Sequence, residues 1–159
     1  MHNWFECKIR YEKVAENGMN KKVTEPYLVD ALSFTEAEAR IIEEITPYIS
    51  GEFTVSDIKR ANYSELFPSE EDAADRWFKC KLFFITLDEK SGAEKKTSTQ
   101  VLVQAADLRD AVKKLDEGMK GTMADYVIAS VAETALMDVY PYDGEPNVKP
   151  EFPDAGKTE

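Results

Sequence analysis

Two short stretches of the sequence alternate aromatic and basic side chains, a combination used by proteins that bind single-stranded nucleic acid. Alternate residues of a strand face the same side, so each stretch presents its rings and cations together if it is extended. Bases stack on the rings and the cations attract phosphates. The candidate binding residues are Trp4, Lys8 and Arg10 in the first stretch, and Trp77, Lys79, Lys81 and Phe83 in the second. In the alternative interpretation, both tryptophans seal a contact within the protein or cap the strand ends, because a Trp side chain is more often part of an interface than of a ligand site.

Few residues of the chain have the chemistry of an active site. The single histidine, His2, lies beside the N-terminus, where we expect a frayed end that supplies no base to a Ser–His or Cys–His pair. The seven glycines form no phosphate-binding loop. Cys7 and Cys80 fall on the apolar phase of their strands, and we expect both to be core thiols. The sequence therefore predicts no enzyme, no cofactor and no metal site; a carboxylate cluster that binds Mg²⁺ is the alternative it leaves open.

The chain is acidic, and its charge is unevenly distributed. There are 20 lysines and arginines against 31 aspartates and glutamates, which gives a net charge of −11 and a pI near 4.7. Residues 77–140 are nearly neutral, with 9 basic and 10 acidic residues, and much of the acidic excess lies in 68–76 and 141–159. The overall field of such a chain repels a phosphate backbone. Only a local basic face would overcome this repulsion.

Composition also bears on the compartment in which the chain works. No apolar run approaches the ~20 residues that a membrane helix needs, and the N-terminus lacks a basic-then-apolar signal segment. Two cysteines are too few for a disulfide framework or a zinc cluster, and free thiols fit a reducing compartment. We therefore expect a cytoplasmic protein without a membrane partner; the sequence is compatible with a homo-oligomer.

The strongest pattern in the sequence is an internal repeat. Trp4–Ile9 recurs as Trp77–Leu82, and matching apolar residues follow at an offset of 73 or 74 positions. Trp and Cys are rare residues, so the shared W-F-x-C-K pattern predicts an ancient duplication. The predicted organisation is one body over residues 1–142, built from repeats at 4–67 and 77–140 with an acidic linker at 68–76, and followed by an acidic, Pro-rich tail at 143–159.

Each repeat has the pattern of two strands, a helix and a third strand. The predicted hairpin turns lie at Asn17-Gly18 and Ser91-Gly92, and the predicted helix N-caps are Ser33 and Asp107. The predicted apolar helix stripes are Phe34, Ala37, Ile41 and Ile45 in the first repeat, and Leu108, Ala111, Leu115 and Met119 in the second. A change of phase in the last strand predicts bulges near Ser56-Asp57 and Ala129-Ser130. The expected fold is α+β, with two ββαβ copies related by a pseudo-two-fold axis and one helix of each copy packed on one face of the sheet.

Segments that carry the repeat also carry a resemblance to a known family. The segments are Trp4–Lys8, Val23–Ala31, Ser33–Arg40 and Gly121–Tyr126. They resemble a family of uncharacterised proteins, a domain of unknown function common in gut Bacteroidetes and their crAss-like phages, and the resemblance extends from residue 3 to about residue 142. It implies a cytoplasmic protein of a bacterium, a prophage or a phage, and it implies no catalytic residues.

These observations favour a non-enzymatic cytoplasmic binding protein, with single-stranded nucleic acid as its ligand, in a phage or mobile-element context. The alternative is a small-ligand trap, or a module that docks a protein partner, and either would use a cleft between the repeats. The prolines of the tail favour an extended segment, and we expect Phe152 to hold it either in an apolar groove of its own chain or on a neighbouring molecule.

Overall fold

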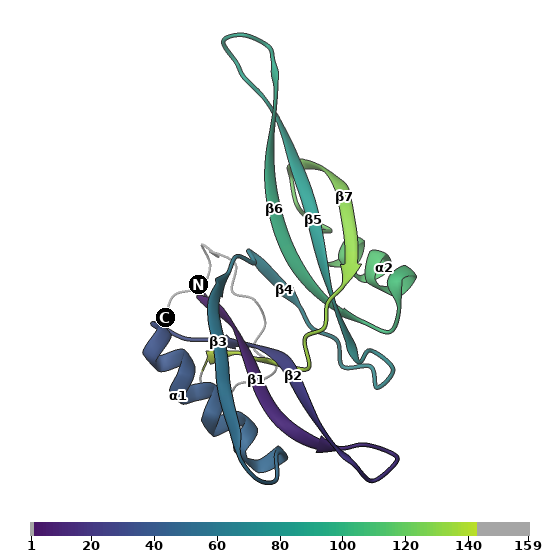
Figure 1. Ribbon diagram of the computed structural model, residues 1–159. Helices are drawn as coiled ribbons and strands as arrows, with labels where there is room; N and C mark the ends of the chain where they lie inside the picture. The colour runs from purple at the N-terminus through teal and green to yellow at the C-terminus, as the bar shows by residue number, and fades with distance from the viewer. Residues whose placement is uncertain (1, 143–159) are drawn as a thin grey trace, which may run out of the picture. The chain divides into compact units, whose positions relative to one another are not determined.

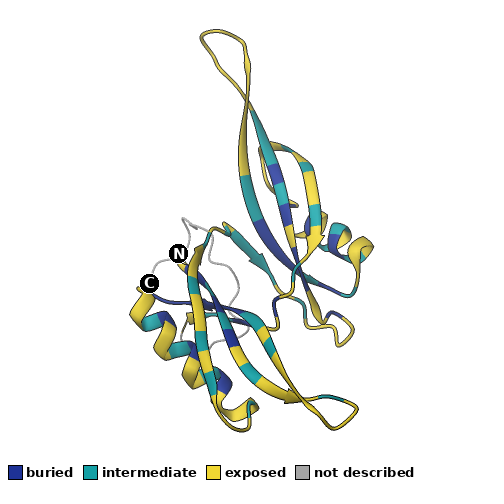
Figure 2. Cartoon of the chain, in the orientation of Figure 1, coloured by how far each residue is buried: buried dark blue, intermediate teal, exposed yellow. Residues whose placement is uncertain are grey.

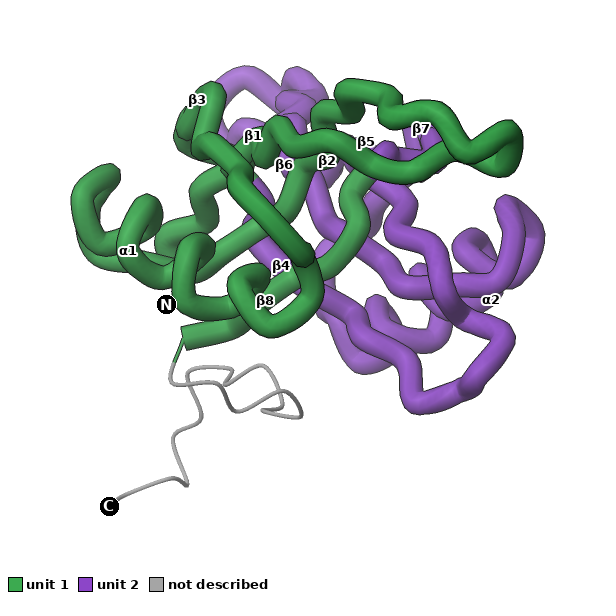
Figure 3. Tube along the Cα trace, turned by 60° about the horizontal axis from the view of Figure 1, so that its bottom comes forward, with its two compact units in different colours: residues 1–62, 136–159 green, residues 63–135 purple. Residues whose placement is uncertain are grey.

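The chain adopts a mixed α+β fold in a computed structural model, which describes residues 2–142 (Figure 1). Buried residues gather on the strands and on one side of each helix (Figure 2). The chain divides into two compact units, unit 1 with residues 2–62 and 136–142 and unit 2 with residues 63–135 (Figure 3). The predicted tail at 143–159, with Phe152, lies outside the described residues.

Unit 1 is a four-stranded sheet with one helix packed against it. Its elements are β1 (Trp4–Val14), β2 (Asn20–Asp30), α1 (Phe34–Ile45), the short 3-10 helix η1 (Thr46–Tyr48), β3 (Phe53–Ala61) and β8 (Val139–Tyr140). The strand order is β3-β1-β2-β8. The first three strands of that order pair antiparallel, and β8 pairs parallel with β2.

Unit 2 has the same arrangement of elements. They are β4 (Glu65–Phe67), β5 (Arg76–Leu87), β6 (Glu94–Ala105), α2 (Leu108–Gly118) and β7 (Asp125–Glu133). The strand order is β4-β6-β5-β7, in which β4 pairs parallel with β6 and the other pairs are antiparallel. A long hairpin, a helix and a returning strand therefore occur once in each unit, as the repeat predicts.

The two short strands each complete the sheet of the other half of the chain. β4 follows β3 in sequence but pairs with β6, and β8 follows β7 but pairs with β2. Equivalent backbone contacts lead into the two strands: the Ser64 amide donates to the Gln100 carbonyl at 2.8 Å, and the Met137 amide donates to the Pro26 carbonyl at 2.8 Å. The compact units therefore differ from the predicted repeats, 4–67 and 77–140, at the C-terminal end of each repeat.

Local sequence signals account for the turns and helix ends. Gly18 and Gly92 have φ values of 82° and 72° in the two hairpin loops, a conformation that glycine adopts without steric cost. The Ser33 hydroxyl accepts from the Glu36 amide at 3.1 Å, and the Asp107 carboxylate accepts from the Asp110 amide at 2.8 Å. Both predicted turns and both predicted N-caps are confirmed.

The predicted bulges are also confirmed. The register of β3 against β1 shifts between Lys8 and Ile9, which leaves Ser56 without an opposite residue. The register of β7 against β5 shifts between Lys81 and Leu82, which leaves Ala129 in the same position. The extra residue restores the inward phase of the apolar side chains that follow, so both edge strands keep an apolar side toward their helix.

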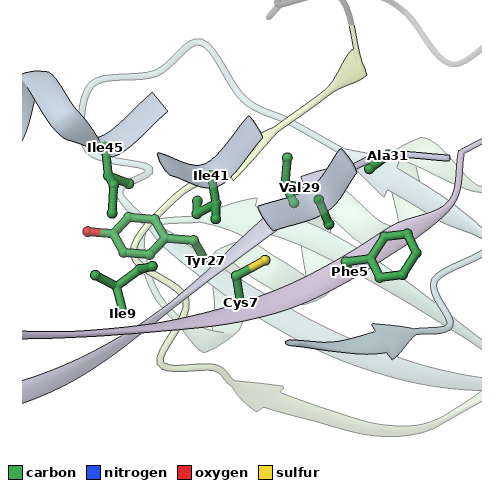
Figure 4. Packing of buried hydrophobic residues seen from close by; sticks show 9 residues of the cluster. Phe5, Cys7, Ile9, Tyr27, Val29, Ala31, Ile41 and Ile45 are labelled. Carbon is green, nitrogen blue, oxygen red and sulfur yellow. The ribbon is translucent and has the colours of Figure 1, made fainter. Parts of the chain in front are cut away.

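Each helix packs on an apolar cluster contributed by alternate residues of its sheet. In unit 1 the strand residues are Phe5, Cys7, Ile9, Tyr27, Val29 and Ala31; in unit 2 they are Phe78, Cys80, Leu82, Val101, Val103 and Ala105. Figure 4 shows Cys7 between Phe5 and Tyr27, on the side where Ile41 lies. The predicted helix stripes are buried except at their first residues: Phe34 is 48% exposed and Leu108 is 52% exposed. Both stand in the first turn, so they cover only the rim of the core.

A basic side chain from each helix contacts the segment that follows the short strand of the same unit, β8 in unit 1 and β4 in unit 2. The Arg40 guanidinium donates to the Pro141 carbonyl at 3.1 Å and lies 5.4 Å from the centroid of the Tyr142 ring. The Lys114 ammonium donates to the Ser69 hydroxyl at 3.0 Å. Arg40 and Lys114 are equivalent positions at the repeat offset of 74, so both units fix their fourth strand in the same way.

Candidate functional site

The helix-free face of unit 2 is the side of its sheet that points away from α2. Phe78, Cys80 and Leu82 pack under α2, so the alternate residues of β5 point to the other side. Residues directly opposite each other on paired strands share a face. The helix-free face is therefore formed by Trp77, Lys79, Lys81 and Phe83 of β5, Lys96, Ser98, Gln100 and Leu102 of β6, and Val127, Ser130 and Ala132 of β7, of which Trp77 and Leu102 are buried.

Lys81 and Phe83 are in direct contact on this face. The Lys81 Nζ atom lies 5.3 Å from the centroid of the Phe83 ring, within the range of a cation–π interaction. Both side chains are half-buried, and Lys79 is exposed. The face thus combines a half-buried aromatic ring with two ammonium groups, as the alternation in the sequence predicts for this stretch.

The lysines of the helix-free face stand beside neutral residues. Lys79 lies opposite Leu102 and Ala132, and Lys81 lies opposite Gln100 and Ser130. Within residues 2–142, no carboxylate lies within 4.0 Å of the side-chain nitrogen of Lys79, Lys81 or Lys96. Their charges are therefore available to an anionic ligand.

The corresponding face of unit 1 has acidic residues opposite its lysines. Lys8 lies opposite Asp57, Glu6 lies opposite Lys59, and Glu12 lies opposite Lys22. Opposite charges at such cross-strand positions attract one another. Arg10 lies opposite Thr24 and Thr54 and is exposed. Of the candidates in the first stretch, Lys8 is therefore matched by an acid, while Arg10 is not.

The two candidate tryptophans are buried. Trp4 is 3% exposed and Trp77 is 5% exposed. The His2 ring stacks on Trp4 with 5.0 Å between the centroids. A base that stacks on a ring needs a free ring face, so in this conformation neither tryptophan offers a stacking platform, and Phe83 remains from the aromatic residues singled out in the sequence.

Both cysteines are core thiols, as predicted. Each is completely buried. Burial raises the pKa of the Cys7 thiol from 9.0 to about 12, with a further contribution from nearby carboxylates such as Glu6, and burial alone raises the pKa of Cys80 to about 11. Because the thiolate is the nucleophilic form, neither side chain is activated at neutral pH.

His2 is held in place, contrary to the expectation of a frayed end. Its Nδ1 atom is hydrogen-bonded to the Asp30 carboxylate, which also accepts from the Asn3 amide at 3.0 Å. Asp30 is 5% exposed. The contact depends on the pairing of Trp4 with Asp30 across β1 and β2, which the sequence alone does not specify, so no sequence signal could have located it.

An open hollow of about 580 Å³ lies at the start of β3 in unit 1. It is lined by Arg10, Tyr11, Glu12, Asn20, Lys22, Ser50, Gly51, Glu52, Phe53 and Thr54. Two basic and two acidic side chains balance in charge there, and all of the lining residues except Tyr11 and Phe53 are exposed. Sequence reasoning missed this hollow, because the loop at 50–52 meets the hairpin only in the folded sheet.

Two further properties concern the described residues alone. Residues 2–142 contain no group of three or more His, Cys, Asp or Glu side chains arranged to hold a metal ion. In the same part of the chain, no helix has the length and apolar character needed to cross a membrane.

Comparison with known proteins gives a family but no characterised relative. The model of a family described as a domain of unknown function, DUF4494, matches residues 3–142. No match was found among curated proteins or among solved structures.

Proposed function

The chain belongs to the DUF4494 family of domains of unknown function, and we propose that it binds single-stranded nucleic acid on the helix-free face of unit 2 without catalysing a reaction. The observation that carries the proposal is the Lys81–Phe83 contact, at 5.3 Å from nitrogen to ring centroid, with Lys79 exposed beside it. A ring on which a base stacks, flanked by cations that follow the phosphates, is the usual composition of single-strand binding surfaces.

The contrast between the two units supports the choice of face. The sequence carries aromatic–basic stretches in both halves, but Asp57 faces Lys8 in unit 1, whereas neutral Ser130 faces Lys81 in unit 2. A carboxylate opposite an ammonium group attracts it in competition with a phosphate. Unit 2 therefore offers Lys79 and Lys81 without an acidic residue directly opposite, even though the whole chain carries a net charge of −11.

We also propose that the two units descend from one duplicated unit. The equivalent caps at Ser33 and Asp107 and the equivalent bulges at Ser56 and Ala129 support this origin. On this view the binding face differs in charge from its unit 1 counterpart where Lys79 stands at the position of Glu6, Phe83 at that of Arg10, Ser130 at that of Asp57, and Ala132 at that of Lys59.

The direct test is a fluorescence-anisotropy titration with labelled single-stranded DNA and RNA of about 12 nucleotides. The compared proteins are wild type, Lys81→Ala and Phe83→Leu, the last of which keeps apolar bulk but removes the ring. The matched control is Lys113→Ala, because Lys113 is exposed on α2, on the other side of the sheet. Circular dichroism melts establish that the variants are folded.

We expect wild-type binding that weakens as salt rises from about 50 mM to about 200 mM. Phe83→Leu should weaken binding by roughly fivefold or more, since a stacked base contributes ~1–3 kcal/mol. Lys81→Ala should also weaken it, and Lys113→Ala should leave the Kd unchanged. Absence of binding at about 50 mM salt would refute the proposal, because phosphate contacts are still strong there. Equal Kd values for all four proteins would show that the ligand binds at another part of the chain.

Intrinsic fluorescence supplies an independent check on which ring stacks. Both tryptophans are buried, so bound bases should leave the tryptophan emission nearly unchanged while the anisotropy rises. Strong quenching of that emission would contradict a site centred on Phe83, because quenching requires close contact between a base and an indole ring.

A further inference from the structure

The helix-free face extends beyond the Lys81–Phe83 contact along the β5–β6 hairpin. Lys96 lies directly opposite Ile85 on the paired strand, and Ile85 points to the same side as Phe83. Lys96 is exposed and has no acidic partner among residues 2–142. The face therefore ends in a third free cation on the hairpin.

The spacing of these cations gives the length of the ligand. Ile85 lies six positions after Lys79, and at ~3.3 Å per strand residue this distance is ~20 Å. An extended single strand covers this distance with about four nucleotides, the lower end of the site sizes that single-strand binders use. Acidic residues enter this face at that end: Asp125 lies opposite Ile85, in the same cross-strand row as Lys96, and Glu94 lies opposite Leu87.

We infer that the ligand is an oligonucleotide of about four or more nucleotides that runs along β5, with phosphates at Lys79, Lys81 and Lys96 and a base on Phe83. The inference rests on the proposed function and adds the length and the course of the ligand. Three phosphate contacts predict a defined salt dependence. A plot of log affinity against log salt concentration should have a slope of about −2 for a single strand.

Lys95 provides a matched control for Lys96. The two residues are adjacent and both are exposed, but Lys95 lies opposite Thr86 and so points to the side of the sheet that carries α2. The experiment measures the Kd of wild type, Lys96→Ala and Lys95→Ala for oligothymidylates of about two, four, six and eight nucleotides, each at several salt concentrations.

We expect wild-type affinity to rise steeply up to about four nucleotides and only slowly beyond. Lys96→Ala should weaken binding of the longer oligonucleotides, reduce the salt slope by about 0.7 and leave the shortest one unaffected, while Lys95→Ala behaves as wild type. If the wild type binds but both variants give the same Kd and slope, the inferred course is wrong while the proposed function stands. If the wild type binds no oligonucleotide of any length, both fail.

Discussion

The residue opposite each lysine determines whether its charge is free for a ligand. In unit 1, Asp57 lies opposite Lys8; in unit 2, Ser130 lies opposite Lys81 at the equivalent position. Both neighbours lie on edge strands, next to the bulge. A single carboxylate at residue 130 would reproduce the unit 1 arrangement on the helix-free face.

Ser130→Asp should therefore weaken single-strand binding by roughly tenfold. The new carboxylate would attract the Lys81 ammonium and repel the phosphate, and charge pairs at this range are worth about a kcal/mol each. Ser130→Asn, which is similar in size but neutral, serves as the control and should bind nearly as wild type does. The measurement is the anisotropy Kd at low salt. An unchanged Kd for Ser130→Asp would show that Lys81 makes no phosphate contact.

Buried thiol and phenol groups should make the protein sensitive to alkaline pH. Burial raises the pKa of Cys7 from 9.0 to about 12 and that of Tyr27 from 10.0 to about 12, and burial also raises the pKa of Tyr140. The unfolded chain loses these protons at lower pH than the folded chain does. The free energy of unfolding is therefore at its full value below about pH 9 and falls between about pH 9 and 12.

The check is denaturant unfolding of wild type and Cys7→Ala at a series of pH values from about 7 to 11. Cys7→Ala removes one of the titrating groups, so its unfolding midpoint should depend less on pH in the alkaline range. A wild-type midpoint that stays constant up to about pH 11 would contradict the assigned direction of these pKa shifts.

At the scale of elements, the exchange of short strands makes the last part of the chain essential to unit 1. β8 lies against β2, where Val139 is 8% exposed and the Tyr140 ring stacks on Tyr27 with 6.2 Å between centroids. The Arg40 guanidinium is bound to the Pro141 carbonyl in the same region. These contacts join unit 1 to a segment more than a hundred residues away in sequence.

A chain that ends at Ala135 should lose the structure of unit 1 and keep that of unit 2. It lacks Leu136 and Val139, each 8% exposed, and the half-buried Tyr140, and burying a side chain of this kind completely contributes ~1.5–3 kcal/mol. Hydrogen exchange followed by mass spectrometry should show faster exchange over 4–61 and little change over 76–133. A chain that ends at Tyr142 retains every described contact and is the control. Equal exchange over 4–61 in both truncated chains would contradict this role of β8.

The sequence predicted the elements whose signals are local. Hairpin turns, N-caps and bulges each depend on a few neighbouring residues, so patterns such as Asn17-Gly18 and Ser33-x-x-Glu36 locate them. β4 and β8 have only three and two residues, and their partners lie in the other half of the chain. No short-range pattern specifies such a pairing, so the exchange was missed.

For the candidate site, alternation along β1 and β5 predicted which residues share a face, but it did not predict their surroundings. The burial of Trp4 and Trp77 and the pairing of Lys8 with Asp57 follow from strand register and tertiary packing. Of the candidates predicted from the sequence, the structure brings together Lys79, Lys81 and Phe83. The two lysines have no acidic residue directly opposite. Lys96 joins them only through the register of the β5–β6 hairpin.

At the scale of the whole molecule, a net charge of −11 opposes approach to any polyanion. Local cations act over about a Debye length, ~10 Å at 0.1 M salt, while the acidic remainder of the chain is screened. We therefore expect modest affinity and slow association at very low salt, where screening of the acidic residues is weakest. Binding by the helix-free face should decline as salt rises above about 50 mM, because phosphate contacts are then screened.

The most direct test of the binding face is an NMR titration of ¹⁵N-labelled protein with an unlabelled oligothymidylate of about eight nucleotides at about 50 mM salt. We predict that amide shifts concentrate at Lys79–Phe83, at Lys96–Gln100 and at Val127–Ser130, while α1, α2 and the strands of unit 1 stay unchanged. Absence of shifts, or shifts concentrated on β1 and β3, would contradict the assignment of single-strand binding to the helix-free face of unit 2.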